Sequence, residues 1–520
     1  MKYSPYNFKH KTTSKLISRK MKRLPEIFDV FILGAGPAGL CAAIRLLEMG
    51  YTVGMLEQEE FPRPQIGESL SPGIRNIFEY LNAKHLLENP AYLENCAAKV
   101  IWENKEQVYN RPAQSKGGII VDRSKLDQDL LEFTVSKGLQ IIQPGKLKQA
   151  LNSENGWLLE ITAGLDEIKI SSKIVLDARG RKGTLLKERM PIAPSAVAVW
   201  THIETNSVCN EALIEAVEEG WLWGSPVCGN RYRIMTFTDP IALKKNSESH
   251  LLEVMRKTKL FSPFVNEIRG EAIETCSVTS FVNQNPWKNG FIKIGEAAFT
   301  LDPLSSTGVE KAMRFSLQVA IAINTYLKDP DSPHPKDFYE EKLIESVVSH
   351  AHWTADYYRN AWTSNEKTEF WTKRTNFQLD VSKNETDFTL KLEKEFNTNG
   401  ILFEKKQEPI PVDFILYRFW NEEIVVSPHA TFKTVYAISK DSIVLKEALL
   451  HPNLERPSVY LDQIELFPFL KNINGKVVSS IVAHLNTTIG IEKSKKILVF
   501  LLSNHLLVVD KKEQEFNHYL

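Results

Sequence analysis

The sequence has few cysteines and no long hydrophobic run. Its 520 residues include five cysteines, none in a C-x-x-C pair, so we expect neither a metal site nor a disulfide framework. No stretch reaches the roughly 18 consecutive apolar residues that a transmembrane helix needs. A secretory signal is not expected either, because the basic start of the chain has no apolar segment. These absences predict a protein without a membrane span in a reducing compartment, the cytoplasm.

The chain also lacks an excess of charge of either sign. It has 64 Lys and Arg residues against 64 Asp and Glu residues, which gives no reason to expect nucleic acid or an anionic membrane as a partner. The exception is local, because residues 1–25 contain eight basic residues and no acidic one. We expect residues 1–25 to form a flexible, solvated tail. An organelle-targeting segment and an arm for an anionic partner are the alternatives.

The length and the hydrophobic content of the chain allow several domains. With 43% hydrophobic residues, a chain of this size can bury more than one core, and two or three domains are expected. Residues 28–33 form a short apolar run that ends in glycines, as a buried parallel strand does. Residues 37–48 have the apolar spacing of a helix, and residues 51–56 predict a second strand. The three segments predict a βαβ unit, the usual carrier of a dinucleotide site.

A glycine motif lies at the turn between the first strand and the helix. Its first glycine permits a tight turn, its second lets the backbone approach a pyrophosphate, and its third allows the helix to pack closely on the strand. Glu57 follows 18 residues after the motif, where a carboxylate can accept hydrogen bonds from ribose hydroxyls. This context predicts binding of an adenine dinucleotide. The candidate residues in the motif are Gly34, Gly36, Pro37, Ala38 and Gly39.

Two further segments favour FAD over NAD. Residues 62–71, PRPQIGESLS, form a polar loop with a proline-restricted entry, which would suit a strap passing over an isoalloxazine ring. Residues 295–308, GEAAFTLDPLSSTG, are rich in small side chains and lead into a helical run. The start of that helix would offer unpaired N–H groups and a positive dipole end to an electron-rich ligand. We call residues 62–71 the strap and residues 295–308 the flavin wall.

Long inserts separate the segments that belong to the cofactor domain. Residues 173–176 and 291–294 predict further strands of that domain. The inserts at 75–165 and 190–285 contain alternating, β-like stretches, which predict a second domain that faces the substrate. Residues 339–374 predict an aromatic helical pair that packs on the cofactor domain.

These segments resemble those of a known superfamily, the flavin monooxygenases of the p-hydroxybenzoate hydroxylase fold, and within it the flavin-dependent halogenases. The resemblance implies an α/β fold, in which a Rossmann-like FAD-binding domain and an inserted β-sheet substrate domain are interleaved over residues 26–400. The motifs that carry it are GAGPAG, IGESLSP at 66–72, VDRSKLDQDLL at 121–131, LDARGRKG at 176–183, GWLWGSP at 220–226, GEAAFTLDPLSSTG and YYRNAW with EFW at 357–371.

The resemblance implies cofactor contacts on the strap and near it. Gln65, Ile66 and Gly67 would lie against FAD, and Arg123 looks like an FAD-contacting arginine. LDARGRKG at 176–183 lacks the Asp-Gly pair that related hydroxylases use around a pyridine nucleotide. This departure favours reduced FAD that is supplied by a separate flavin reductase as partner.

The resemblance also implies contacts from the flavin wall. Asp302, Thr307 and Gly308 would lie beside the isoalloxazine ring. Glu296 replaces the aspartate that is usual in the family's Gly-Asp motif. Because Glu296 keeps the carboxylate with one extra methylene, a hydrogen bond to the flavin ribityl chain is still expected.

Halogenation and hydroxylation both fit this superfamily. Both begin when reduced FAD reacts with oxygen to form a C4a-hydroperoxide, and the protein then positions the substrate and excludes water. A halogenase adds a halide site, which backbone N–H groups of the flavin wall could provide, and a lysine that relays the halogen. Lys99 is the candidate relay. Because GWLWGSP resembles the Trp-x-Trp-x-Ile-Pro element of halogenases, Trp221, Trp223 and Pro226 are the candidate substrate residues.

Other features favour hydroxylation. Ser305 stands where tryptophan halogenases have a glutamate, and the sequence around Lys99 matches the halogenase lysine motif poorly. The chain also resembles flavoproteins that hydroxylate a peptidyl tryptophan during maturation of quinone-cofactor amine dehydrogenases and oxidases, including a C…W segment like that at 96–102. The candidate catalytic residues are Lys99, Thr307 and Glu68.

A separate C-terminal domain is expected over residues 409–520. Its last part predicts three helices followed by a β-hairpin, and it resembles a winged helix of the peptide-recognition kind. Such a domain can bind an extended leader or precursor peptide as an added strand. Packing or dimerisation is the alternative, and the lack of a basic recognition helix argues against DNA.

The sequence therefore predicts an FAD-dependent enzyme that hydroxylates an electron-rich aromatic ring with oxygen. An indole is the expected ring, either in an aromatic small molecule or in a tryptophan within a peptide. The alternatives are a flavin-dependent halogenase for indole or phenol, an alkene reductase of the geranylgeranyl-reductase type, and a flavin-binding scaffold without turnover.

Overall fold

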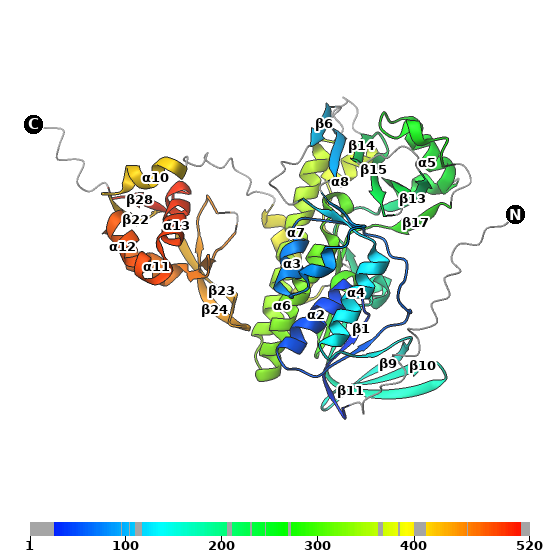
Figure 1. Cartoon of the computed structure of the whole chain (residues 1–520), viewed down its shortest axis with the longest axis horizontal. Helices are drawn as coiled ribbons and strands as arrows, with labels where there is room; N and C mark the ends of the chain where they lie inside the picture. Colours follow the sequence, from blue (N-terminus) through cyan, green and yellow to red (C-terminus); the bar gives the residue numbers. More distant parts are fainter. Residues whose placement is uncertain are drawn as a thin grey trace, which may run out of the picture. The chain divides into compact units, whose positions relative to one another are not determined.

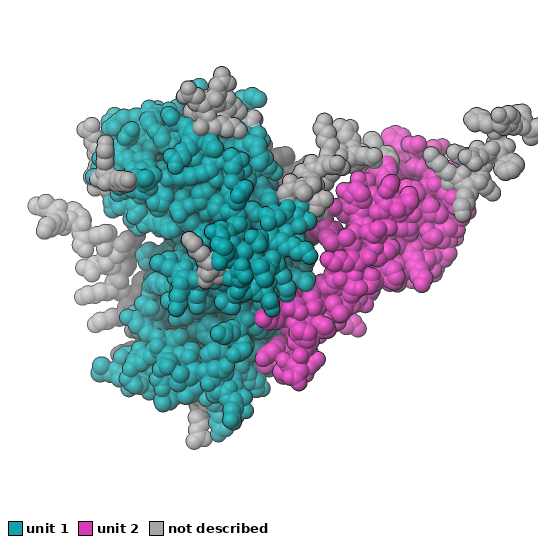
Figure 2. Space-filling view, turned by 180° about the vertical axis from the view of Figure 1, so that it is seen from behind, with its two compact units in different colours: residues 1–324, 339–399 teal, residues 325–338, 400–520 magenta. Residues whose placement is uncertain are grey.

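The chain divides into two compact units. The computed structural model describes residues 25–94, 96–102, 105–109, 117–204, 211–228, 231–244, 246–268, 272–361, 368–382, 385–399, 412–454 and 456–510. Unit 1 comprises Met1–Asn324 and Tyr339–Asn399, and unit 2 comprises Thr325–Phe338 and Gly400–Leu520 (Figure 2). The predicted tail, apart from Pro25, lies outside the described residues, as does Trp362 of the aromatic segment.

A mostly parallel sheet forms the centre of the part of unit 1 that is expected to bind the cofactor, which we call the cofactor part. Its strand order is β19-β20-β11-β1-β2-β8, and β1 pairs in parallel with both β2 and β11. Helix α2 (Pro37–Glu48) connects β1 to β2, so the predicted βαβ unit is present. The bounds of the strands are β1 Phe28–Leu33, β2 Val53–Leu56, β8 Gln140–Ile142, β11 Asp166–Asp177, β19 Trp287–Lys288 and β20 Phe291–Lys293.

Strand β11 is long enough to pair with different strands along its length. Its last residues pair in parallel with β1, while its first part pairs in antiparallel fashion with β10 (Gly156–Ala163), which in turn pairs with β9 (Lys146–Ser153). These three strands extend away from the helices of the cofactor part (Figure 1). LDARGRKG begins at the end of β11, next to the glycine turn that follows β1.

A seven-stranded sheet, which we call the substrate sheet, forms the second part of unit 1. Its strand order is β17-β13-β16-β15-β14-β5-β6. Strand β14 pairs in parallel with β5 and in antiparallel fashion with β15. The bounds are β5 Ala97–Trp102, β6 Lys105–Tyr109, β13 Val197–Glu204, β14 Glu211–Val217, β15 Gly220–Val227, β16 Arg231–Thr238 and β17 Glu274–Ser277.

The two faces of the substrate sheet differ in their partners. One face packs against α5 (Ser247–Arg256) through aliphatic side chains such as Leu213 and Leu222. The other face, which we call the aromatic face, packs against the end of α7 (His334–Arg359) and against α8 (Glu369–Thr375). Because successive side chains of a strand point to opposite faces, each residue of a paired strand can be assigned to one face.

The aromatic helical segment was predicted to pack on the cofactor domain, and this is right for its first part. Tyr339 at the unit 1 end of α7 donates a hydrogen bond to the carbonyl of Lys293 on β20. The later aromatic residues instead lie on the substrate sheet. They contribute Tyr358, Phe370 and Trp371 to a buried cluster with Trp221. The prediction missed this because the chain turns from one part to the other within the segment.

Short strands pair the strap and the flavin wall with other segments of unit 1. Strand β3 (Ser69–Leu70) at the end of the strap pairs with β7 (Ile119–Ile120), and β7 leads directly into α4 (Arg123–Ser136). Strand β21 (Phe299–Thr300) of the flavin wall pairs with β18 (Phe281–Asn283). Helix α6 (Gly308–Lys328) then begins where the flavin wall ends.

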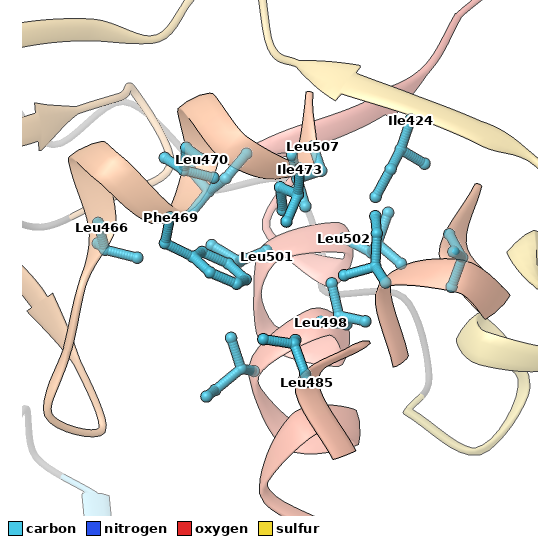
Figure 3. Packing of buried hydrophobic residues seen from close by; sticks show 14 of the residues in the cluster. Ile424, Leu466, Phe469, Leu470, Ile473, Leu485, Leu498, Leu501, Leu502 and Leu507 are labelled. Atoms are coloured by element: carbon cyan, nitrogen blue, oxygen red, sulfur yellow. The ribbon is translucent and has the colours of Figure 1, made fainter. Parts of the chain in front are cut away.

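Unit 2 has its own hydrophobic core. Leucines of α13 (Ile491–Ser503) pack against α11 (Leu466–Ile473), α12 (Val478–Ile489) and the strand β22 (Glu423–Val426) (Figure 3). Strand β28 (Leu507–Val509) pairs with β22 in a three-stranded sheet, so these residues do not form the predicted β-hairpin within the described part of the chain. The remaining described elements of residues 400–520 are α10 Val412–Phe419, β23 Thr431–Ser439, β24 Ser442–Leu450, β25 Tyr460–Leu461, β26 Ile464–Glu465 and β27 Lys476–Val477.

No helix in the described part of the chain is both long enough and apolar enough to cross a membrane.

Loss of a large side chain from the aromatic cluster should destabilise unit 1. Trp371 is 1% exposed, and its indole N–H donates to the carbonyl of Val217 at 3.0 Å. We expect Trp371→Ala to lower the free energy of unfolding by about 3–5 kcal/mol, measured by urea denaturation. The control is Trp353→Ala on α7, where the side chain is 39% exposed. A loss as large for Trp353→Ala would contradict the assignment of the cluster as a core.

Candidate flavin and substrate site

The turn after β1 has the geometry that a pyrophosphate requires. Gly34 has φ +102°, and a Cβ on it would lie 2.7 Å from the carbonyl oxygen of Ala178. A Cβ on Gly39 would lie 2.2 Å from the carbonyl oxygen of Gly34, so the close packing of helix on strand requires glycine. A Cβ on Gly36 would meet nothing within 4 Å. No side chain caps the start of α2, so no side-chain hydrogen bond competes with a phosphate group for its N–H groups.

Glu57 is buried at the end of β2, and its carboxylate is held in place by the backbone. One oxygen accepts a hydrogen bond from the N–H of Ala35 at 2.8 Å, and the other accepts one from the N–H of Glu59 at 2.9 Å. The guanidinium of Arg63 lies 3.8 Å away. Each carboxylate oxygen has a second lone pair, so Glu57 fits the predicted contact with a ribose.

Arg123 holds the strap. Its guanidinium is buried and forms two hydrogen bonds with the carboxylate of Asp127, at 2.8 and 2.9 Å. Its remaining nitrogen donates to the carbonyl groups of Ile66 and Gly67, at 3.1 and 3.3 Å. Gly67 has φ +96°, which favours glycine at this bend. Gln65 is exposed and accepts a hydrogen bond from Arg63. Arg123 therefore fixes the backbone of the strap to α4.

A hydrogen-bond chain connects the flavin wall to the substrate sheet. The hydroxyl of Tyr358 donates to the carboxylate of Asp302, with both oxygens at 2.9 Å. The indole N–H of Trp221 on β15 donates to the same hydroxyl at 3.2 Å. Burial raises the pKa of Asp302, while the N–H of Leu304 and the Tyr358 hydroxyl act in the opposite direction. Sequence analysis had assigned Tyr358 to packing, and its aromatic neighbourhood gave no signal of this contact.

Helix α7 also contacts the backbone carbonyl of Asp302. The backbone carbonyl of Asp302 lies 3.2 Å from Nε2 of His350, and Nδ1 of His350 lies 3.5 Å from the ammonium of Lys311 on α6. Burial and the charge of Lys311 lower the pKa of His350 to about 4. His350 is therefore neutral at pH 7, so Nε2 can donate to the carbonyl while Nδ1 accepts.

The end of the flavin wall turns sharply into α6. Ser306 has φ +50°, and the hydroxyls of Ser305 and Thr307 lie 2.7 Å apart. A Cβ on Gly308 would meet nothing within 4 Å, so the start of α6 is open to a planar ring. Glu296, earlier in the wall, is half-exposed and accepts a hydrogen bond from Arg181 at 3.2 Å.

The two tryptophans of GWLWGSP have different environments. Trp221 is buried and stacks on Phe237 with 3.9 Å between ring centroids. Trp223 is partly exposed on the same face of the substrate sheet. Pro226 is buried on β15. Trp221 thus belongs to the buried core of the aromatic face. Trp223, which is partly exposed, is the better candidate for contact with a substrate.

Partly buried apolar residues pack against the buried cluster of the aromatic face, as Trp223 does. They include residues of three strands and one residue of the flavin wall, so the wall contributes to the same apolar cluster as the sheet. These residues are Val100, Ile214, Met235 and Leu304. Such a surface suits an aromatic ring that must be kept from water.

Lys99 lies on the opposite face of the substrate sheet. It pairs with Leu213, which packs against α5, whereas Val100 and Trp102 belong to the aromatic face. Its ammonium lies 2.8 Å from the carboxylate of Glu106 on β6. The hydrogen bond and charge of Glu106 raise the pKa of Lys99. The structure therefore does not bring Lys99 together with Thr307, and its role as a relay stays a prediction without geometric support.

Glu68, the third candidate catalytic residue, forms an ion pair with Arg233 on β16. The sequence did not identify Arg233 as a partner of Glu68. Arg233 lies two residues before Met235 on β16, so its side chain lies on the aromatic face. Among the described residues, no group of three or more His, Cys, Asp or Glu side chains could hold a metal ion.

Substitution of Gly36 tests the pyrophosphate site without disturbing the fold. Gly36 has φ −78° and ψ 174°, which alanine adopts readily, and its Cβ would project into open space. We expect Gly36→Ala to weaken FAD binding by about tenfold or more, because the methyl group occupies the approach to the pyrophosphate. The dissociation constant is measured from flavin fluorescence. Thermal stability of the FAD-free protein should not change, whereas the control Gly39→Ala should lower it; unchanged affinity in Gly36→Ala would contradict the site.

Comparisons with known proteins agree with this architecture. The sequence model of the tryptophan halogenase family matches residues 29–111 and 94–408. A tryptophan 2-halogenase of Chondromyces crocatus is 23% identical over 374 residues, covering 67% of this chain and 71% of that protein. The structure is similar to the peptidyl tryptophan dihydroxylase QhpG, with TM-score 0.67, 16% identity and coverage of 92% and 99% of the two chains. It is also similar to CmlS, a flavin-dependent halogenase, with TM-score 0.66, 20% identity and coverage of 94% and 96%.

The family match extends over most of the cofactor part and the substrate sheet. It includes the glycine turn, the strap, GWLWGSP and the flavin wall. The chain belongs to the tryptophan halogenase family and is an FAD-dependent enzyme.

Proposed function

We propose that the enzyme hydroxylates an electron-rich aromatic ring, and that the ring is the indole of tryptophan. In the balanced reaction, reduced FAD, oxygen and the aromatic compound give oxidised FAD, the hydroxylated ring and water. Bound FAD supplies the two electrons and the activation of oxygen. The observation that carries the proposal is the aromatic face, which meets the flavin wall at Leu304 and offers Trp223 to a ring.

The residues of the chain would bind, orient and shield the reactants. The N–H groups at the start of α2 would hold the pyrophosphate, and Glu57 would hold the ribose. Asp302, fixed by Tyr358, would keep the flavin wall against the isoalloxazine ring. The apolar aromatic face would exclude water and hold the substrate ring within reach.

Two observations favour hydroxylation over halogenation. Lys99 lies on the face that packs against α5 and is paired with Glu106. Ser305, which stands where tryptophan halogenases have a glutamate, is engaged with the hydroxyl of Thr307.

Halogenation is the second candidate, and the family match supports it equally. The open start of α6 at Gly308 could accommodate a halide beside the flavin. In that reaction reduced FAD, oxygen, halide, a proton and the aromatic compound give oxidised FAD, the halogenated ring and two water molecules.

A separate reductase is the proposed source of reduced FAD. Asp177 of LDARGRKG binds Arg179 through both carboxylate oxygens, at 2.9 and 2.7 Å. This loop is therefore occupied by its own ion pair and lacks the Asp-Gly pair expected around a pyridine nucleotide.

Unit 2 supports a peptide as the substrate. Its helices α11, α12 and α13 pack with the sheet β27-β22-β28, an arrangement consistent with the winged-helix-like domain expected from the sequence. QhpG, which has a similar fold over 92% of this chain, acts on a peptidyl tryptophan according to its name. We propose that unit 2 binds a leader or precursor peptide, by strand addition where a sheet edge is open.

Product masses should distinguish the two reactions. We expect the enzyme, supplied with reduced FAD, oxygen, bromide and a panel of indoles and tryptophan peptides, to add one or two oxygen atoms. Mass spectrometry of the products is the measurement. Lys99→Ala should leave hydroxylation unchanged, because Lys99 lies on the opposite face of the sheet. A brominated product that disappears in Lys99→Ala would establish the relay and overturn the hydroxylase proposal.

Removal of the C-terminal part should affect turnover of a peptide substrate and of a free substrate differently. We expect deletion of 409–520 to lower turnover of a tryptophan peptide far more than turnover of free indole, since the proposed peptide contact is lost. Turnover is measured at saturating reduced FAD for both substrates. Equal losses would argue against peptide recognition by this part, and the FAD content of the shortened protein controls for misfolding.

A further inference from the structure

The strap is held by a second buried arginine, which comes from the substrate sheet. Arg233 on β16 donates from one terminal nitrogen to the carboxylate of Glu68 at 2.6 Å. The Arg233 side chain is 6% exposed and the Glu68 side chain is 12% exposed. The same carboxylate oxygen of Glu68 accepts the N–H of Gly67 at 3.0 Å. The ion pair therefore fixes both the side chain of Glu68 and the bend of the strap.

His202 sets the direction of the Arg233 guanidinium. His202 on β13 lies directly opposite Arg233 in the sheet register, and its Nε2 lies 3.0 Å from Nε and 2.8 Å from Nη2 of Arg233. Burial and the charge of Arg233 lower the pKa of His202 to about 4. The neutral imidazole accepts from the guanidinium, which leaves the remaining terminal nitrogen to face Glu68.

Arg233 and Arg123 hold neighbouring residues of the strap from different parts of the fold. Arg123 belongs to α4 and binds the carbonyl groups of Ile66 and Gly67, while Arg233 binds the side chain of Glu68. Arg233 lies on the aromatic face, two residues before Met235. The strap is thus fixed to the cofactor part by one arginine and to the substrate sheet by the other.

Stability alone is a weak explanation for this ion pair. A buried ion pair contributes little net stability, because removing both charges from water offsets much of their attraction. In some proteins such pairs select one arrangement of the chain over others. The ion pair between Arg233 and Glu68 joins the strap to the substrate sheet, so the arrangement it would select is the position of the strap relative to the aromatic face.

We propose that Arg233 is a positioning residue that acts through Glu68 to hold the strap in the conformation that binds FAD. The inference rests on the FAD site of the proposed function, but not on which atom the enzyme transfers to the ring. Because Arg233 lies on the substrate sheet, it also makes FAD affinity depend on the structure of the surface that binds the aromatic ring.

The test compares FAD affinity with thermal stability in the full-length protein. We expect Arg233→Met and Glu68→Gln each to raise the FAD dissociation constant about tenfold, a change typical of coupling between sites. Titration of FAD followed by flavin fluorescence gives this constant. Arg233→Lys should give a smaller rise, because lysine keeps the charge but lacks the planar fork that reaches both His202 and Glu68. Arg231→Met on the same strand is the matched control, since Arg231 is exposed.

The double variant Glu68→Gln with Arg233→Met separates positioning from folding. Arg233→Met alone leaves Glu68 charged and without its partner, so the melting temperature of the FAD-free protein should fall. The double variant removes both charges, so its melting temperature should recover while FAD binding stays weak.

Four outcomes decide between these possibilities. Weak binding at a recovered melting temperature supports the proposal. An FAD dissociation constant that returns to the wild-type value together with the melting temperature would overturn it, as would wild-type affinity in Arg233→Met. Wild-type protein that does not bind FAD would instead overturn the proposed function on which the inference rests.

Discussion

The half-buried carboxylate of Asp302 is the constraint on which the geometry of the site depends. A buried polar group without a partner costs about 1–3 kcal/mol, and a buried charge costs more. Asp302 meets this requirement with the N–H of Leu304 and the hydroxyl of Tyr358. Because Tyr358 also accepts the indole N–H of Trp221, the end of α7 must lie between the flavin wall and β15. A single hydroxyl therefore connects two segments that are 81 residues apart in the chain.

The parts of the site that the sequence predicted are those whose chemistry is local. The glycine turn is the clearest case, since Gly34 and Gly39 are required by close backbone contacts within a single βαβ unit. Glu57 belongs to the same unit and lies where the spacing placed it. The strap and the flavin wall were also recognisable, because their small and polar residues depart from the periodicity of the neighbouring strands and helices.

Contacts between distant segments could not be predicted from a single sequence. Glu68 and Arg233 are separated by 165 residues, and nothing in either segment indicates the other. Lys99 is a different case, because the information was available. Trp102 lies three residues after Lys99 on the same strand, so the two side chains must point to opposite faces. Strand alternation around a buried tryptophan would have placed Lys99 away from the aromatic face.

The division of the substrate sheet into two faces bears directly on the chemistry. Lys99 lies on the face that packs against α5, whereas Leu304 of the flavin wall packs against the cluster on the aromatic face. Arg233 and His202 on that face are directed toward each other and toward Glu68. The strand neighbours of Trp223, Ile214 and Met235, are apolar. Our proposal of direct transfer to a bound ring, rather than relay through an amine, rests on this separation of charged and apolar groups, while the family match supports halogenation equally.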